Sequence, residues 1–407
     1  MTLFAVARLP REILFGSGQR SVIGRVAARY GSRALVCTDQ RFAATATFAD
    51  ILASLESASL TVDVFDDVEP DVPYDAVGPF VDRVRSFGAD LVIGIGGGSC
   101  LDMAKCAALL LRHGGTLRDY YGEFKVPGPT LPVIALPTTA GTGSEVTPVA
   151  VVSDSSRTLK VGISSPHLVP VVAICDPDLT STCPPSLTAI AGADALTHAI
   201  EAFTAVRRTP HADLAQDHVF VGKNDLSDHF ALQAIGLLGG HLGRACADGS
   251  DAVARASVMM GALLAGCAFG TAGTAAAHAI QYPVGALTGT PHGLGVATLL
   301  PYVMTYNRPA AMAEFAAIAD ALGLGTAGWA PEAKADAAIA EVARLFAGIG
   351  IAPTLEALGL KRDRLDWTAE QAIGIDRLIK NNPRPLDASA MKRLVRAAFE
   401  GDLAAAA

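Results

Sequence analysis

Three features are scarce in this 407-residue sequence: paired cysteines, charged residues and an excess of positive charge. The seven cysteines are an odd number, lie far apart and include no Cys-x-x-Cys pair. This pattern argues against a disulfide framework and against a thiolate zinc site. We therefore expect reduced cysteines that serve as small apolar side chains in a cytoplasmic protein.

Charged residues make up 18% of the chain, and the formal net charge is −8. Nucleic acids are bound mainly through Lys and Arg, so we expect no nucleic-acid partner. Hydrophobic residues make up 51%, which is enough for a large core and excludes a disordered chain. The length predicts two or three domains.

Membrane and export signals are weak. Within residues 1–16, the charged residues Arg8 and Arg11 come before any long apolar run, so we expect no signal peptide. Charge is then missing from residues 256–307, whose apolar start, MMGALLAGCAFGTAGTAAA, is long enough to span a bilayer. That segment is rich in Ala, Gly and Thr and runs into His278 and Pro283, so we expect a deeply buried helix and no membrane partner.

The first half of the chain alternates short β-branched runs with helical stretches such as 48–57 and 77–87. Strand–helix alternation predicts a doubly wound parallel sheet, and hence a Rossmann-like α/β domain. The expected strands are RALVCTD at 33–39, ADLVIGIGGGS at 89–99, PVIALPTT at 132–139 and VVAICDP at 171–177.

Beyond Pro185 convincing strands disappear, and long Ala- and Leu-rich segments with helical spacing follow one another. We therefore predict an α/β domain over 1–185 and an all-α domain over 186–407. Residues 211–225 break the helical pattern, which indicates a loop insertion.

The segment IGIGGGSCLDMAK at 93–105 takes a hydrophobic strand through Gly97, Gly98 and Ser99 straight into a helix. Glycines allow the backbone to approach a phosphate closely, and the N–H groups of a helix start attract an anion. The motif is not Gly-x-Gly-x-x-Gly, so on its own it fits an ordinary tight β–α connection equally well.

A second loop, PTTAGTGSEVT at 137–147, is crowded with small and hydroxyl residues, as expected around a nucleotide. A flexible loop is the alternative, which two such loops on one sheet disfavour. Asp39 ends an expected strand, where its carboxylate could accept hydrogen bonds from a ribose, or could simply cap the next helix. Spacing alone gives Lys160 no role beyond that of a solvated cation.

Asp194 and His198 are four residues apart, so on a helix they project from the same face. An isolated Asp-x-x-x-His is more often an exposed pair than a metal site. His278 and His292, however, both lie in the charge-free stretch, where a histidine must be hydrogen-bonded or metal-bound. One carboxylate and three imidazoles suit Fe²⁺ or Zn²⁺.

Taken together, these segments resemble the iron-containing (group III) alcohol dehydrogenase family. The resemblance covers essentially the whole chain. It implies an N-terminal nucleotide-binding domain, a C-terminal helical domain and a catalytic divalent metal in the cleft between them. The matching segments, in order, are GGGSCLDMAK, PTTAGTGSEVT, CDPDLTSTCPPSLTAIAGADALTHAIEAF, AGCAFGTAGTAAAHAIQYPVGA and TPHGLGVATLLPYV.

The resemblance also implies individual roles, with Asp39 favouring NAD over NADP. Phe269 matches an aromatic residue beside the substrate, although core packing explains it equally well. The implied metal ligands are Asp194, His198, His278 and His292, with Fe²⁺ or Zn²⁺ as the metal. The implied NAD-binding residues are Asp39, Gly97, Gly98, Ser99, Thr138, Thr139, Ser144, Thr147, Lys160 and Leu179.

Two departures from the family pattern stand out. Many members carry a further histidine, often assigned to proton relay, where this chain has Tyr282, four residues after His278; we name Tyr282 and His278 as the candidate catalytic pair. The insertion before Ser227, together with HAIQYP, resembles the hydroxyacid–oxoacid transhydrogenase branch, which keeps its nicotinamide cofactor bound.

The predicted function is reversible hydride transfer between NAD(H) and a small alcohol, diol or hydroxy acid, by a cytoplasmic homo-oligomer that family analogy makes a dimer. The transhydrogenase is the alternative. A dehydroquinate-synthase-like lyase would need more basic residues here, and a non-catalytic nucleotide-binding protein would not need the Asp/His set. A carboxylate substrate would need a cation, for which Arg377, Lys380 and Arg384 are candidates, although a solvated charged face explains them too.

Overall fold

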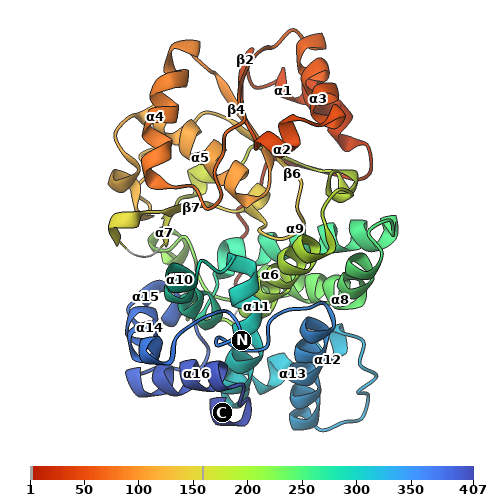
Figure 1. Cartoon of the computed structure of the whole chain (residues 1–407), viewed down its shortest axis with the longest axis vertical. Coiled ribbons are helices and arrows are strands. Elements are labelled where there is room, and N and C mark those ends of the chain that lie inside the picture. The colour runs from red at the N-terminus through yellow and green to blue at the C-terminus, as the bar shows by residue number, and fades with distance from the viewer. Residues whose placement is uncertain (1–2, 158–159) are drawn as a thin grey trace. The chain divides into compact units, whose positions relative to one another are not determined.

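The chain forms two compact units in the computed structural model, which describes residues 3–157 and 160–407 (Figure 1). One unit comprises Arg8–Thr182 and the short segment Gln216–Val219. The other comprises Met1–Ala7, Cys183–Ala215 and Phe220–Ala407. The first contains the sheets and the second is helical, so we describe them as the α/β unit and the helical unit.

The α/β unit is built on a six-stranded sheet in which every neighbouring pair is parallel. After β2 the chain runs outward to β3 and then returns to the other side of β2 to form β4. Ligands of open α/β sheets bind at such a reversal, beyond the carboxyl ends of the strands. The spatial order is β1 (Glu12–Phe15), β9 (Val172–Cys175), β6 (Val133–Pro137), β4 (Leu91–Gly96), β2 (Arg33–Cys37) and β3 (Thr61–Phe65).

Alternate side chains of the central strands enter two different cores. Ala34 and Val36 of β2 pack in one buried cluster, whereas Leu35 and Cys37 pack in the other. Because side chains alternate across a strand, both faces of the sheet must be covered, and helices cover them. This explains why the sequence of β4, LVIGIG, is apolar throughout.

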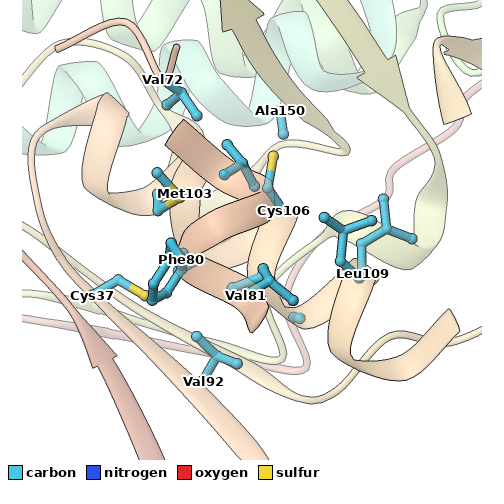
Figure 2. Packing of buried hydrophobic residues seen from close by; sticks show 14 of the residues in the cluster. Cys37, Val72, Phe80, Val81, Val92, Met103, Cys106, Leu109 and Ala150 are labelled. Carbon is cyan, nitrogen blue, oxygen red and sulfur yellow. The ribbon is translucent and has the colours of Figure 1, made fainter. Parts of the chain in front are cut away.

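Two helices lie against each face. The cluster around Val36 receives residues of α1 and α3, and the cluster around Leu35 receives residues of α4 and α5. Figure 2 shows the second cluster, where Phe80 and Val81 of α4 pack near Met103 and Cys106 of α5. The helices of this unit are α1 (Ile23–Ala27), α2 (Gln40–Ala43), α3 (Ala46–Ser57), α4 (Tyr74–Val84) and α5 (Gly98–His113).

A second, three-stranded sheet extends the same unit. It pairs β5 (Gly122–Glu123) in parallel with β8 (Lys160–Ser164), and β8 in antiparallel fashion with β7 (Val149–Ser153). Strand β7 of this sheet begins two residues after the PTTAGTGSEVT loop and so fixes where that loop ends.

The helical unit has no strand among its described residues and contains a third buried cluster, built from α10, α11, α14 and α16. Its helices are α6 (Pro185–Thr204), α8 (Asp225–Ala247), α9 (Ala252–Ala272), α10 (Ala276–Thr288), α11 (His292–Asn307), α12 (Met312–Ala321), α13 (Pro331–Gly348), α14 (Leu365–Ile373), α15 (Asp376–Ile379) and α16 (Ala388–Glu400). The four-residue helix α7 (Leu214–Asp217) lies inside the predicted insertion.

Helix α9 satisfies the length and composition criteria for a membrane span, and it was the one helix among the described residues to do so. Of its apolar window, 67% is buried within the folded chain. Burial of this extent is what a core helix shows, and length and composition alone are weak evidence for a membrane.

The predicted fold class, a doubly wound α/β region followed by an all-α region, is confirmed. All four predicted strand runs contain strands of the large sheet, β2, β4, β6 and β9. The edge strands β1 and β3 and the small sheet were not predicted, because their sequences are short and mix polar with apolar residues. The domain boundary at residue 185 stays a prediction.

Candidate metal and nucleotide sites

Helix α6 places the first two candidate metal ligands. Asp194 and His198 lie one turn apart and are both buried, with His198 Nε2 3.7 Å from Asp194 Oδ1. This stretch of α6 is buried on nearly every side, so two polar side chains here need partners inside the fold.

Helices α10 and α11 bring the other two histidines to the same carboxylate. His278 is in the first turn of α10, and its Nε2 is 3.9 Å from Asp194 Oδ1. His292 is the first residue of α11. One ligand atom each from Asp194, His278 and His292 lie within 4.8 Å of one another. The fold therefore gathers residues that are almost 100 positions apart in sequence.

His198 joins this cluster through its ring. The ring stacks between Phe269, at a centroid distance of 4.2 Å, and His278, at 4.8 Å. The rings of His278 and His292 are 5.2 Å apart. Phe269 of α9 therefore contacts a candidate ligand directly and is also part of the buried core, while its place beside a substrate stays a prediction.

The donor set fits a divalent metal. His278 Nε2 is buried and makes no hydrogen bond within the described part of the chain, although it faces the Asp194 carboxylate. Two metal bonds of about 2.1 Å span at most about 4.2 Å between ligand atoms, so the cluster needs only a small contraction to enclose an ion. Three imidazoles and one carboxylate accept Fe²⁺ and Zn²⁺ alike.

Sequence reasoning missed Glu201. Its carboxylate accepts hydrogen bonds from the backbone N–H groups of Ala275 (2.8 Å) and Ala277 (2.7 Å), and Oε2 lies 2.6 Å from His278 Nδ1. A carboxylate at Nδ1 keeps the proton on that atom and leaves Nε2 as the lone-pair donor. The available signal was spacing, because Glu201 lies seven residues after Asp194, two turns along one helix face.

Tyr282 lies one turn after His278 on α10, and its ring centroid is 6.1 Å from that of His292. Burial raises the pKa of the Tyr282 hydroxyl, while the positive charge of Arg377 acts in the opposite direction. The candidate proton-relay residue thus lies beside the cluster.

The glycine loop leaves β4 at the strand reversal of the α/β unit. Helix α5 begins at Gly98 with Gly97 as its N-cap and no side-chain cap. Thr138, which follows β6, donates its backbone N–H to the Gly96 carbonyl (2.9 Å), so the two predicted loops are in contact. A Cβ on Gly98 would lie 2.7 Å from the Thr142 side chain, so only glycine fits there.

Asp39 forms the helix cap that was its alternative interpretation. Its Oδ1 accepts a hydrogen bond from Phe42 N (2.9 Å) at the start of α2. Its Oδ2 is 3.9 Å from Cys100 Sγ at the start of α5, so the carboxylate also borders the glycine loop. The helix cap is therefore present, and the ribose contact of Asp39 stays a prediction.

Side chains of α5 bind Ser144 and Thr147. The Ser144 hydroxyl donates to Asp102 Oδ1 (2.6 Å), and Lys105 Nζ donates to the Thr147 carbonyl (3.0 Å) and, more weakly, to its hydroxyl (3.4 Å). Lys105 is fully buried, and desolvation lowers its pKa to about 8. Asp102 and Lys105 were missed because they read as ordinary members of an amphipathic helix.

The remaining predicted nucleotide residues are distributed around these loops. Ser99 Oγ accepts a hydrogen bond from Asp71 N (2.9 Å), and the Asp71 carboxylate pairs with Lys160 Nζ (2.5 Å). Lys160 is therefore joined to the glycine loop through Asp71. Thr139 lies beside the glycine loop, whereas Leu179 is buried in the apolar cluster around Val36.

Glycine- and hydroxyl-rich loops at the reversal of a doubly wound sheet, and a buried carboxylate–imidazole cluster, are features typical of metal-dependent enzymes that use a nucleotide. Comparison with known proteins makes this specific, and the chain belongs to the iron-containing alcohol dehydrogenase family. Residues 10–177 match iron-containing alcohol dehydrogenase, and residues 215–399 match the C-terminal part of that family.

Relatives agree over almost the whole chain. It is 38% identical to long-chain-alcohol dehydrogenase 1 of Geobacillus thermodenitrificans over 91% of this chain and 90% of that protein. It is 32% identical to the NAD-dependent methanol dehydrogenase of Bacillus methanolicus over 96% of this chain and 99% of that protein. A crystal structure of 1,3-propanediol oxidoreductase superposes with a TM-score of 0.90 at 34% identity, covering 97% of this chain and all of that one.

These comparisons establish an oxidoreductase that interconverts alcohols and aldehydes. The relatives are dehydrogenases, so the comparisons do not favour the transhydrogenase alternative.

Proposed function

We propose that this alcohol dehydrogenase uses NAD(H) and a divalent ion, Fe²⁺ or Zn²⁺, to interconvert small alcohols with their aldehydes. One observation carries the proposal: Asp194 Oδ1 lies within 4.0 Å of His198 Nε2 and His278 Nε2 and close to His292, in a buried cluster. Imidazole and carboxylate groups that are buried and converge on one point in this way are suited to bind a divalent metal ion.

Asp194, His198, His278 and His292 would hold the ion. When bound, the ion supplies a Lewis acid for the alcohol or aldehyde oxygen, and the nicotinamide ring exchanges the hydride. Phe269 shields one face of His198, and the charge-free sequence around the cluster keeps the local dielectric low. These residues position the reacting groups and exclude water.

Tyr282 is our candidate for the proton step. Tyr282 lies one turn of α10 after the candidate ligand His278, and its hydroxyl can both donate and accept a proton. In aldehyde reduction the tyrosine would pass that proton toward the developing alcohol oxygen, and in alcohol oxidation it would take the proton back.

Binding of NAD would fall to the α/β unit. We assign the pyrophosphate to Gly97, Gly98 and Ser99, and the ribose to Asp39, whose Oδ2 borders this loop at Cys100. Hydroxyls of the second loop and its neighbours would line the nucleotide: Thr138, Thr139, Ser144, Thr147, Lys160 and Leu179.

The assay that tests the proposal follows consumption of NADH with a short aldehyde, using enzyme reconstituted with Fe²⁺ or Zn²⁺. His278→Ala should lose bound metal and at least about 100-fold in kcat/KM, because it removes a ligand. The matched control is His241→Ala, since the hydrogen bond of the His241 ring among the described residues is to the Leu237 carbonyl of its own helix. Full metal content and turnover in His278→Ala would refute the ligand assignment.

We also propose a cytoplasmic homodimer whose regions 1–185 and 186–407 act as separate domains. Six of the seven cysteines are buried, as suits thiols that serve the core. Light scattering during gel filtration measures the oligomeric state, and a calorimetric scan that shows two separate transitions would support the domain division.

A further inference from the structure

The turn between α9 and α10 leads into His278. Helix α9 ends at Ala272, and the chain then passes through Gly273, whose φ of +81° lies in the left-handed region. Helix α10 starts with Ala275 as its N-cap, and this residue has no side-chain hydrogen bond to the helix. Every residue from 271 to 277 is buried. Polar backbone groups of a buried turn need partners, so this turn depends on other parts of the chain.

Two side chains that are distant in sequence bind this turn. The carboxylate of Glu201 in α6 accepts hydrogen bonds from two N–H groups at the start of α10. The side-chain amide of Asn381, which follows α15, donates from Nδ2 to the carbonyls of Ala272 and Thr274, at 3.0 Å each. Glu201 therefore binds donors of the turn, whereas Asn381 binds its acceptors.

Asn381 is itself fixed in place. The residue is 3% exposed, its N–H donates to the Leu378 carbonyl (3.2 Å), and its carbonyl accepts from Val206 N (3.0 Å). A Cβ on Gly273 would lie 3.1 Å from Asn381 Nδ2, so the amide touches the turn directly. Its Oδ1 is buried and makes no hydrogen bond within the described part of the chain. The two hydrogen bonds from Nδ2 are therefore what this amide contributes.

The place of His278 depends on where this turn puts the start of α10. His278 Nδ1 is 2.6 Å from Glu201 Oε2, and its Nε2 is 3.9 Å from Asp194 Oδ1. Metal–ligand bonds tolerate changes of only about 0.2 Å, so a small displacement of the first turn of α10 would move Nε2 away from an ion. A group that fixes the turn can therefore act on the metal site without touching the metal.

We propose that Asn381 is a positioning residue of the candidate metal site. Its two hydrogen bonds to the turn fix the first turn of α10, and hence the imidazole of His278. The inference rests on the proposed function, because it requires that His278 binds the ion. Loss of the amide would remove the side-chain donor of two buried carbonyls, which costs free energy unless the turn shifts to find another donor.

Asn382 offers a matched control, because it is the next residue, is also 3% exposed and also donates twice through its amide. Its Nδ2 binds Asn307 Oδ1 and the Arg384 carbonyl, at 2.7 Å each. Asn307 is the last residue of α11, about 22 Å along that helix from His292. Asn382→Leu therefore removes equivalent hydrogen bonds at a distance from the turn and from the metal cluster.

The test measures binding of Co²⁺ alone, which accepts imidazole and carboxylate ligands as Fe²⁺ and Zn²⁺ do. In competition with a chelator, Asn381→Leu should lower Co²⁺ affinity about 10-fold and change the visible spectrum of the bound ion, because His278 is displaced. Asn382→Leu should keep the wild-type spectrum and an affinity within about twofold, although both variants should unfold at lower urea concentrations. Asn381→Ala removes the same donors without crowding the turn and replaces the Leu variant if that one does not fold.

Hydrogen exchange of the metal-free protein gives a second readout. The N–H groups of Ala275 and Ala277, which Glu201 binds, should exchange at least about tenfold faster in Asn381→Leu than in Asn382→Leu, because the turn opens more often. Equal losses of Co²⁺ affinity in the two Leu variants would show that affinity only follows stability, which overturns the inference. If the wild type binds no Co²⁺, the proposed function fails and the inference falls with it. Binding that Asn381→Leu leaves intact refutes the inference alone.

Discussion

At the scale of single residues, the carboxylate of Glu201 decides what His278 can do. One side chain satisfies two backbone N–H groups at the start of α10 and the Nδ1 of His278. Those contacts orient the imidazole so that Nε2 faces Asp194. The four candidate ligands could be predicted because Asp and His are residue types that bind metals. Glu201 looks like any helical glutamate until α6 and α10 are packed together.

Glu201→Gln should weaken metal binding about 10- to 100-fold, because an amide can hold Nδ1–H but does not raise the basicity of the ring as a carboxylate does. Metal affinity is measured by competition with a chelator, without turnover. ¹⁵N spectra of the metal-free protein should show a changed His278 tautomer population.

Glu341→Gln provides the control, since Glu341 pairs only with the exposed Arg344. Unchanged affinity and an unchanged tautomer in Glu201→Gln would mean that Glu201 serves only to cap the turn at Ala275.

At the scale of elements, the first two turns of helix α5 contact both of the predicted nucleotide loops. Its first residues form the glycine turn, and one turn later Asp102 and Lys105 hold the segment from Ser144 to Val151 by side-chain and backbone contacts. Sequence predicted the two loops from their composition. It could not predict that one helix supports both, since that depends on strand order and on a lysine buried 42 residues from its partner.

Gly98→Ala should reduce NADH affinity by about tenfold, because the new Cβ would lie 2.7 Å from the Thr142 side chain and displace the second loop. Fluorescence titration of NADH measures the effect. The matched control is Gly240→Ala in α8, where a Cβ meets nothing within 4 Å. An unchanged NADH affinity in Gly98→Ala would show that the close approach of the loops is not needed for binding.

At the scale of the whole molecule, buried ionisable groups make stability depend on pH. Burial raises the pKa of Glu145, beside Lys105, to about 7. In the unfolded chain this carboxyl ionises near its ordinary value of 4.5, so the folded state holds a proton that the unfolded state has already lost. The stabilisation is complete below about pH 4.5 and is lost as the pH rises through 7.

Glu145→Gln removes that dependence. The free energy of unfolding of the wild type, relative to Glu145→Gln, should fall by about 3 kcal/mol between pH 4.5 and 7.5. Urea unfolding of both proteins at the two pH values measures the difference. A constant difference across this range would show that folding leaves the pKa of Glu145 at its ordinary value.

The helical unit combines residues from both ends of the chain, and the α/β unit includes a short segment from its middle, Gln216–Val219. The backbone N–H groups of Phe4 and Val6 donate to the side chains of Asp225 and Asn224, while Arg8 contacts the carbonyls of His218 and Val219. During synthesis the large sheet can therefore form before the segment ahead of Arg8 has its binding partners, which lie more than 200 positions further along the chain. A translational pause before residue 225 would leave that segment exposed to proteases, and a bulky fusion placed ahead of it would slow the last docking step rather than the first.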